Sequence, residues 1–305
     1  MNSDVEGRLL GYGLRPETVR QYLRCLGWLE ETVGLGLDEW GRGDLDSLMA
    51  FFQSPIPRKF WKRGDVPELY SPATVKQYLA ALKTYYRVYE DQRVNWVVRA
   101  PRSRGKKPKP VIEDVEGFLD EVWNSPNTHT NPYIDWRNKF MLWFAYFFAC
   151  RRSELPIIRL SDVDNNKLYA KVEDLKGGGG TYVEPMSSPL FWSKFDEYKD
   201  IRGRQGVYLF GSSCREDGRK ISKSTVSRAF RGFDFLLERY GIRDVNCTPH
   251  LLRRTRATVV AGRLNTKQAM YVTRHKSVGS FQRYVDLGLS DKMRGEMMDS
   301  GALEV

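Results

Sequence analysis

The first hundred residues repeat one pattern of hydrophobic positions, with the three- and four-residue spacing of an amphipathic helix. The apolar stripe consists of Val19, Tyr22, Leu23 and Leu26 in one segment and of Val75, Tyr78, Leu79 and Leu82 in the other. Pro16 and Pro72 open these segments, where the missing N–H of a first helical turn costs nothing, and Ser71 is a suitable N-cap. We therefore expect residues 1–99 to form a helical domain.

From residue 111 onward, the pattern predicts a second domain that is mainly α with a small β-sheet or hairpin. Helical spacing predicts helices over Val115–Val122, Phe140–Ala149, Phe191–Tyr198, Ser224–Tyr240, Leu251–Ala261 and Thr266–Tyr271. Alternating apolar residues on both sides of a run of four glycines predict a β-hairpin over residues 168–185. We expect this domain to span residues 111–305.

A basic segment joins the two predicted domains at residues 100–110. The sequence RAPRSRGKKPK over residues 99–109 combines proline, glycine and repeated basic side chains, which resist both helix and strand. It is either a solvated linker or an extended strap along a phosphate backbone, and we favour the strap because both flanking segments look globular. The basic residues expected to contact DNA here are Arg102, Arg104, Lys106, Lys107 and Lys109.

The net charge indicates a polyanionic partner. The chain of 305 residues has a formal net charge of +11 and is 41% hydrophobic, enough for real cores. Nucleic acid is the favoured polyanion and an acidic membrane surface the alternative. In the two N-terminal helices, Arg20 and Lys76 lie off the apolar stripe, where they could meet DNA or form an ordinary solvated face.

Other classes of protein receive no support from the sequence. The apolar stretch Met141–Ala149 is too short to span a membrane, and the polar start MNSDVEG is unlike a secretory signal, so we expect a cytoplasmic protein. Cys25, Cys150, Cys214 and Cys247 form no CxxC pair and no zinc spacing, so we expect reduced thiols and no metal.

Two clusters near the C-terminus contain the residue types that phosphodiester chemistry needs. His250 and Arg253 are three residues apart, which places them on one side of a helix, and Tyr284 follows His275 by nine residues. Arginine neutralises phosphate with a fixed fork, histidine holds or moves protons, and tyrosine can attack phosphorus. Arg151 is a second candidate for the phosphate clamp. This combination suggests DNA cleavage through a phosphotyrosine.

The predicted hairpin adds a lysine beside the glycine run. Lys176 could give a proton to a leaving 5′-oxygen, or it could be an ordinary exposed turn residue. The run GGGG lacks the order of residues that a phosphate-binding loop requires, so nucleotide binding is disfavoured.

These elements together resemble the tyrosine recombinases of the Xer and phage-integrase type. The resemblance rests on Arg151 with Ser153-Glu154-Leu155, on Lys176-Gly177, on PHLLRRTRAT around Arg253, and on HKSVGSFQRYVDL from His275 to beyond Tyr284. Residues 13–90 are similar to the helical core-binding domain of that family, so the resemblance covers nearly the whole chain. It implies a two-domain architecture in which a core-binding domain and a mixed α/β catalytic domain form a C-shaped clamp on DNA.

The resemblance also implies roles for single residues. Arg151 and Arg253 would hold the scissile phosphate, His250 and His275 would hydrogen-bond it and assist proton transfer, Lys176 would be the general acid, and Tyr284 would form a 3′-phosphotyrosine. Glu154 would support these groups. Neither ATP nor a metal cofactor is implied. The partners would be double-stranded DNA attachment sites, bound by a homotetramer that exchanges strands through a Holliday junction, with the C-terminal tail docked on a neighbour.

The sequence departs from the family pattern at several positions. Arg274 stands where glycine is usual before the second histidine, Arg254 stands where histidine is frequent, and glycines replace the basic residues after Lys176. Arg152 beside Arg151 also permits a shift of one residue in the assignment. Integration or excision of a plasmid or virus and resolution of chromosome dimers both remain open, with a slight preference for a mobile-element integrase. The alternatives are a type IB topoisomerase and a DNA-binding protein without catalysis.

Overall fold

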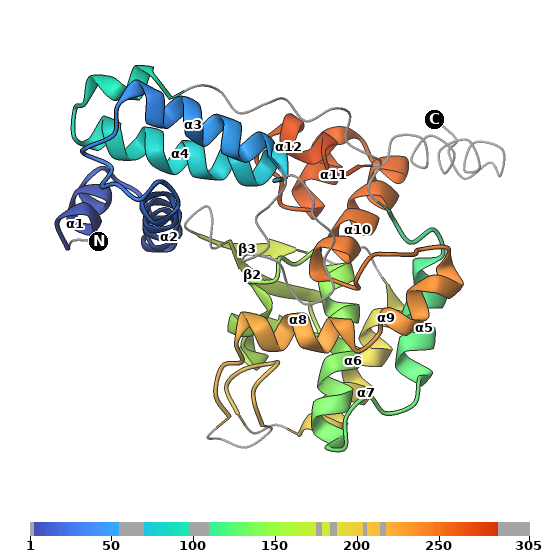
Figure 1. The fold of residues 1–305 in the computed structure, drawn as a ribbon. Coiled ribbons are helices and arrows are strands. Elements are labelled where there is room, and N and C mark those ends of the chain that lie inside the picture. The colour runs from blue at the N-terminus through green and yellow to red at the C-terminus, as the bar shows by residue number, and fades with distance from the viewer. Residues whose placement is uncertain are drawn as a thin grey trace. The chain divides into compact units, whose positions relative to one another are not determined.

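The computed structural model describes residues 3–54, 70–97, 110–174, 179–183, 188–203, 206–213 and 218–285. The chain divides into two compact units, Met1–Lys107 and Pro108–Val305, and each has its own hydrophobic core. Helices dominate both units, and the described strands all belong to the second (Figure 1). The predicted class, mainly α with a small β-sheet, is confirmed.

The first unit is built from helices that bury the predicted apolar stripes. Its elements are α1 Ser3–Gly11, α2 Pro16–Val33, α3 Arg42–Gln53, α4 Pro72–Val88 and the 3-10 helix η2 Gln92–Asn95. Helix α2 packs against α4, and the core contains Val19 and Leu26 of the first with Leu79 and Leu82 of the second. The Ser71 hydroxyl accepts the Thr74 N–H at 3.1 Å, so the predicted N-cap is confirmed.

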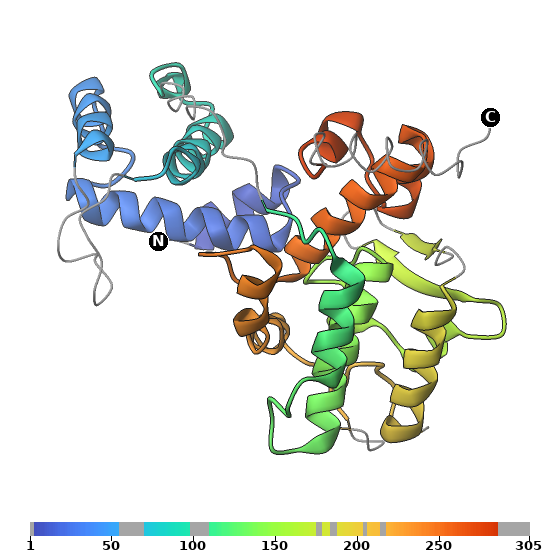
Figure 2. The same cartoon turned by 90° about the vertical axis from the view of Figure 1, so that its right-hand side faces the viewer.

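The second unit contains the remaining helices and the sheet. Its helices are α5 Val115–Asn124, α6 Pro132–Phe147, α7 Pro189–Arg202, α8 Lys223–Arg231, α9 Asp234–Leu237, α10 Pro249–Arg263, α11 Thr266–Val272 and α12 Val278–Gln282. Its 3-10 helices are η3 Leu155–Ile157, η4 Leu160–Asp162 and η5 Glu238–Tyr240. Helix α6 packs against α5, α7 and α10, which surround it in Figures 1 and 2.

Helix α6 begins eight residues before the predicted start at Phe140 and ends at Phe147, two residues early. The added turns contain polar residues that are nevertheless buried. Asp135 and Lys139 form an ion pair at 3.1 Å with both side chains almost fully buried, and the Lys139 ammonium also donates to the Ser125 carbonyl at 2.7 Å. The pattern of apolar residues could not reveal this turn, because the charged groups satisfy each other inside the protein.

The predicted helix Ser224–Tyr240 is broken into α8, α9 and η5. The break falls at Gly232 and Phe233, and Phe233 has a non-helical backbone at φ −112° and ψ 12°. Glycine is the most costly residue after proline in a helix interior, so a helix end is favoured there. Both Phe230 and Phe233 are fully buried, and the turn lets both reach the core.

The small sheet is antiparallel and has three strands in the order β1-β2-β3. Strand β2 (Tyr169–Asp174) pairs with β3 (Gly179–Val183), which confirms the predicted hairpin, and Val172 lies opposite Thr181. Two of the four glycines, Gly179 and Gly180, belong to β3 and not to the turn. Strand β1 (Val163–Asp164) was not predicted, since two residues are too few to show a pattern.

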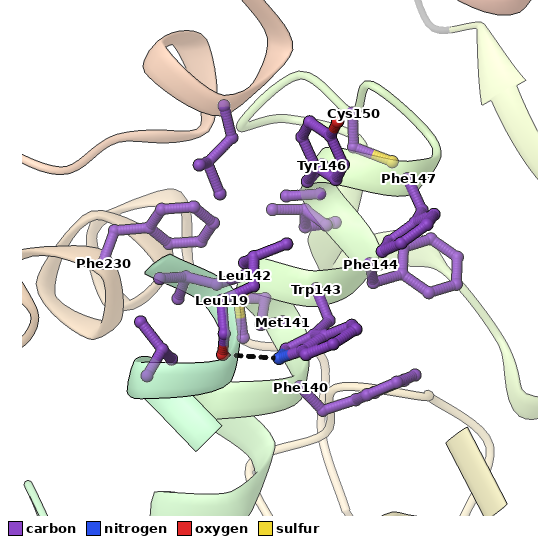
Figure 3. Close-up of a cluster of buried hydrophobic side chains, with 14 of the residues drawn as sticks. Leu119, Phe140, Met141, Leu142, Trp143, Phe144, Tyr146, Phe147, Cys150 and Phe230 are labelled. Atoms are coloured by element: carbon purple, nitrogen blue, oxygen red, sulfur yellow. Dashed lines mark hydrogen bonds between the residues drawn. The ribbon is translucent and has the colours of Figure 1, made fainter. Parts of the chain in front are cut away.

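Aromatic side chains along α6 form the centre of the larger core. A helix that is buried on all sides needs apolar residues on all sides, and Phe140 to Phe148 supply them. Figure 3 labels several of these side chains, among them Phe140, Trp143 and Phe147. The Trp143 indole N–H donates to the Leu119 carbonyl at 3.0 Å, the hydrogen bond drawn in Figure 3. This packing fixes the C-terminal end of α6, directly before Arg151.

A second, smaller core joins α10, α11 and α12. It consists of Ala257, Val260, Ala269, Val272 and Phe281, with Tyr284 packed against it. This cluster determines where the segment from His275 to Tyr284 lies relative to α10.

Three cysteines are described, Cys25, Cys150 and Cys247, and all are free and buried. Among the described residues, no helix has both the length and the hydropathy that crossing a membrane requires.

Candidate active site

The site begins where α6 ends. After Phe147 the chain turns at Ala149, whose φ of 44° is left-handed, and this turn exposes the carbonyl groups of Phe148 and Ala149 to guanidinium groups from α10 and from the residues after α11. The C-terminal end of a helix is the negative end of its dipole, so cations are stabilised there. The end of the buried helix therefore gathers arginines.

Glu154 joins two of these arginines. Its carboxylate is fully buried, accepts from the Arg151 Nη1 at 2.7 Å and from the Arg274 Nη2 at 2.6 Å, and also accepts the Arg151 backbone N–H at 2.7 Å. Burial alone would raise the pKa of Glu154, but Arg274 and Arg151 outweigh it and hold the pKa below the ordinary value. Glu154 is therefore an anion that orients two guanidinium groups.

Arg253 is the most enclosed of the arginines. It has no exposed surface, and its Nη atoms donate to the carbonyl oxygens of Ala149 and Thr273. Its Nε has no hydrogen-bond partner among the described residues. Burial lowers the pKa of Arg253 to about 10, helped by the charges of Arg151 and Arg274, so the group is still a cation at neutral pH.

The neighbouring arginines Arg151 and Arg152 lie in different surroundings. Arg151 is mostly buried and lies in the cluster with Glu154, where its Nη2 also donates to the Arg274 carbonyl at 3.3 Å. Arg152 is exposed and donates to the Ser227 hydroxyl at 3.2 Å. Arg151 is the member of the pair that belongs to the site.

His275 lies beside the arginine cluster and beside Tyr284. Its Nδ1 is 2.7 Å from the Thr273 hydroxyl, its ring centroid is 4.8 Å from that of Tyr284, and its buried Nε2 has no hydrogen-bond partner among the described residues. Burial lowers the pKa of His275 to about 3, with further lowering by Arg253, Arg151 and Arg274. The imidazole is therefore neutral at physiological pH.

Tyr284 meets groups from both clusters that the sequence singled out. Its hydroxyl lies 3.5 Å from Nδ1 of the exposed His250, near the first turn of α10. The guanidinium carbons of Arg253 and Arg254 each lie 5.8 Å from the centre of its ring. His250 and Arg253 thus approach the same tyrosine, as expected from their spacing on a helix.

The predicted site residues fall into three groups. Arg151, Glu154, His250, Arg253, His275 and Tyr284 lie together. Arg20 and Lys76 are exposed on α2 and α4 of the first unit. The predicted general acid Lys176 and the predicted linker residues Arg102, Arg104, Lys106, Lys107 and Lys109 lie outside the described residues, as does the C-terminal tail.

Two residues of the site were not predicted to take part in it, Arg274 and Thr273. Arg274 has a φ of 53°, the left-handed conformation that suits the glycine usual at this position, and its guanidinium donates to the Phe148 carbonyl at 2.5 Å as well as to Glu154. The departure from glycine was the available signal. Nothing in the linear pattern indicated that Thr273 would contact the histidine.

The lowered pKa of His275 predicts a pH dependence of stability. The unfolded chain binds a proton at the ordinary pKa of 6.5 and the folded chain only at about 3, so the unfolded state binds more protons between these values. The contribution of His275 to the free energy of unfolding is fully present above pH 6.5 and is lost as the pH falls toward 3. Denaturant unfolding of wild type and His275→Gln over this range measures it. We expect the difference between the two proteins to increase with pH; parallel curves would contradict the assignment.

The described residues contain no group of three or more His, Cys, Asp or Glu side chains that could hold a metal ion. The cluster instead presents three guanidinium groups against one carboxylate, an arrangement that suits an anionic ligand.

Residues 120–289 match the model of the family described as "Phage integrase family". No curated protein has a sequence significantly similar to that of this chain. Among solved structures, the chain is similar to a lambda integrase (75-356) dimer bound to a COC' core site, with 18% identity, a TM-score of 0.66 and 92% of each chain covered.

Two further solved structures are similar over most of their length. One is a lambda integrase tetramer bound to a Holliday junction, with 18% identity and a TM-score of 0.66 over 93% of this chain and 75% of that one. The other is the Tn1549 transposon integrase (aa 82-397, Y379F) in complex with transposon right end DNA, with 15% identity and a TM-score of 0.63 over 97% and 98%. At these identities the likeness shows the fold.

Proposed function

We propose, because this chain belongs to the phage integrase family, that Tyr284 is the nucleophile of its reaction. The chain is a tyrosine recombinase, an enzyme that breaks and rejoins DNA in site-specific recombination. The observation that supports Tyr284 is its position between the two histidines and Arg253, with its hydroxyl 3.5 Å from His250 and its ring 4.8 Å from that of His275. Its attack on phosphorus would leave a 3′-phosphotyrosine and release a 5′-hydroxyl.

Arg151 and Arg253 hold the scissile phosphate in this proposal. Charge accumulates on the non-bridging oxygens as the phosphodiester is attacked, and oriented guanidinium donors stabilise it. The unpartnered Nε of Arg253 is a buried donor at the site, and the excess of guanidinium groups over carboxylates favours an anion there. Glu154 orients Arg151, and Arg274 helps to hold Glu154.

Proton transfer completes the chemistry. His250 and His275 lie on either side of Tyr284, where they hydrogen-bond the phosphate and assist proton transfer. Lys176, which stands between β2 and β3 in the sequence, gives a proton to the departing 5′-oxygen. Because the phosphotyrosyl bond conserves the energy of the phosphodiester, the reaction needs neither ATP nor a metal.

The assembly proposed for this chain is a homotetramer on two DNA attachment sites. The support comes from the similar lambda integrase structures, a dimer on a core site and a tetramer on a Holliday junction. The enzyme would act in the cytoplasm, where its DNA substrate is. Integration or excision of a mobile element and resolution of chromosome dimers both fit this chemistry.

The basic linker supplies a prediction about DNA affinity. Replacing Lys106, Lys107 and Lys109 by glutamine should reduce the slope of log K against log salt concentration by about 0.9 for each phosphate contact that is lost. Fluorescence anisotropy with a labelled duplex at several salt concentrations measures this slope. Replacing the exposed Arg20 and Lys76 tests the first unit in the same way. An unchanged slope in both variants would remove these residues from the DNA interface.

The proposed function is tested by separating strand exchange from relaxation. Two labelled duplexes with the cognate site, incubated with the enzyme, should yield joined products of both labels, because a recombinase exchanges strands between partners. A type IB topoisomerase would relax supercoiled DNA without joining two duplexes, and a DNA-binding protein would do neither. The family match and the similar structures do not favour the topoisomerase.

A further inference from the structure

The segment between α11 and His275 contains a buried hydroxyl with two close polar neighbours. The Thr273 Oγ1 lies 2.8 Å from the Ala269 carbonyl oxygen and 2.7 Å from the His275 Nδ1, and Thr273 has no exposed surface. A hydroxyl has one proton to donate, and a carbonyl oxygen can only accept. Both contacts are hydrogen bonds only when the Thr273 proton is directed to Ala269 and the Thr273 oxygen accepts a proton from Nδ1 of His275.

This arrangement of hydrogen bonds favours one tautomer of His275. A neutral imidazole has one N–H, so protonation of Nδ1 leaves Nε2 with a lone pair and no proton. The depressed pKa of His275 agrees with a neutral ring. Nε2 is buried and has no hydrogen-bond partner among the described residues, so in this tautomer it is an acceptor to which no described residue donates.

The groups near His275 limit what that donor can be. The Nη donors of the arginine cluster are directed to Glu154 and to backbone carbonyl oxygens, and the buried Nε atoms of Arg253 and Arg274 bond no described residue, His275 included. A phosphodiester carries no proton, so it would place an acceptor against an acceptor. The hydroxyl of Tyr284 does carry one, and its ring packs on that of His275 at 4.8 Å.

We propose that Thr273 is a positioning residue that fixes His275 with a proton-free Nε2, so that His275 takes up the Tyr284 proton during cleavage. The proposal rests on the proposed function, in which Tyr284 is the nucleophile. It gives the two histidines different roles, because His275 is buried beside the arginine cluster whereas His250 is exposed.

The proposed step balances in atoms and charge. The Tyr284 O–H bond breaks as an N–H bond forms at Nε2, the Tyr284 oxygen bonds to phosphorus, and the bond from phosphorus to the 5′-oxygen breaks. The departing oxygen takes its proton from the general acid, for which Lys176 is proposed. His275 then carries a proton on Nε2 and can donate to a non-bridging oxygen. Rejoining reverses each step and returns the proton to Tyr284.

The bound phosphate also makes this proton uptake easier. Burial disfavours a protonated His275 in the free protein, and the positive charges of Arg253, Arg151 and Arg274 disfavour it further. A phosphodiester bound among these arginines offsets their charge, so the imidazole becomes a better base when DNA is in place. Premature proton uptake is disfavoured in the absence of substrate.

The test reads the tautomer directly. The chain has three histidines, so ¹⁵N-histidine labelling gives few signals, and His275→Gln assigns the one of interest. We compare wild type, Thr273→Val, which removes the acceptor oxygen, and Thr273→Ser, which keeps it. Wild type and Thr273→Ser should show a protonated Nδ1 and a proton-free Nε2 at His275. In Thr273→Val the share of the other tautomer should rise.

Cleavage of a nicked duplex gives the second measurement. Thr273→Val should slow cleavage by about 10- to 100-fold at unchanged DNA affinity, and Thr273→Ser should restore most of the rate. A proton on Nε2 in wild type would overturn the proposal whether or not the variants fold, as would a wild-type rate in Thr273→Val. The spectra need no DNA and no cleavage, so they stand even if another tyrosine proves to be the nucleophile.

Discussion

Replacing Tyr284 by phenylalanine should abolish the covalent protein–DNA complex while DNA affinity stays within about twofold of wild type. The substitution removes one oxygen, which is the attacking atom, and keeps the ring that packs against His275 and the small core around Phe281. Because the hydroxyl lies at the outer limit of a hydrogen bond to His250, its loss should change stability little. Gel analysis of a nicked suicide duplex measures the covalent complex.

The matched control is a tyrosine outside the site. Tyr271 is highly exposed on α11, so Tyr271→Phe should cleave at the wild-type rate. A covalent complex formed by Tyr284→Phe at an appreciable rate would assign the nucleophile to another tyrosine. Loss of DNA binding in Tyr284→Phe would instead indicate a structural role for the hydroxyl.

Replacing Arg253 by lysine should slow cleavage by about 100- to 1000-fold, the range seen when one preorganised donor to a developing oxyanion is lost. Lysine keeps the positive charge but loses the planar fork of arginine. In Arg253 the two Nη atoms of that fork donate to the Ala149 and Thr273 carbonyls, while Nε has no partner among the described residues. Thr273 also contacts His275 through its hydroxyl. Loss of the bond from Arg253 to the Thr273 carbonyl should therefore make the position of the histidine less fixed. Single-turnover cleavage at saturating enzyme measures the loss.

Arg152 offers a control of the same chemistry. It is exposed and bonds the Ser227 hydroxyl, so Arg152→Lys should cleave at nearly the wild-type rate. Thermal unfolding of both variants separates a lost fold from a lost donor. Equal rates for Arg253→Lys and wild type would exclude Arg253 from the phosphate clamp.

Most of the helices could be predicted, because their signals are local. Proline at the first turn, the Ser71 cap and the apolar stripes act within a few residues, and the structure contains helices α2 and α4 where these signals lie. The first turns of α6 were missed because Asp135 and Lys139 are buried as a pair, and polar residues in a sequence do not show that they neutralise each other.

The site shows the same division between local and distant signals. His250 and Arg253 share a helix, so their common side follows from spacing. Arg274 reaches Glu154 across 120 positions of sequence, and its carbonyl contacts at the end of α6 depend on how α10 and α11 pack. No linear pattern encodes that packing, so a departure from glycine could be noticed without its consequence being predicted.

The measurement that tests the central claim most directly is identification of the residue joined to DNA. The enzyme is trapped on a nicked suicide duplex, the complex is digested with protease and nuclease, and the peptide that retains a nucleotide is sequenced by mass spectrometry. The chain has 16 tyrosines, so the result discriminates sharply. We predict a 3′-nucleotide linked to Tyr284; a nucleotide on any other residue, or a link to a 5′-phosphate, would contradict the proposed chemistry.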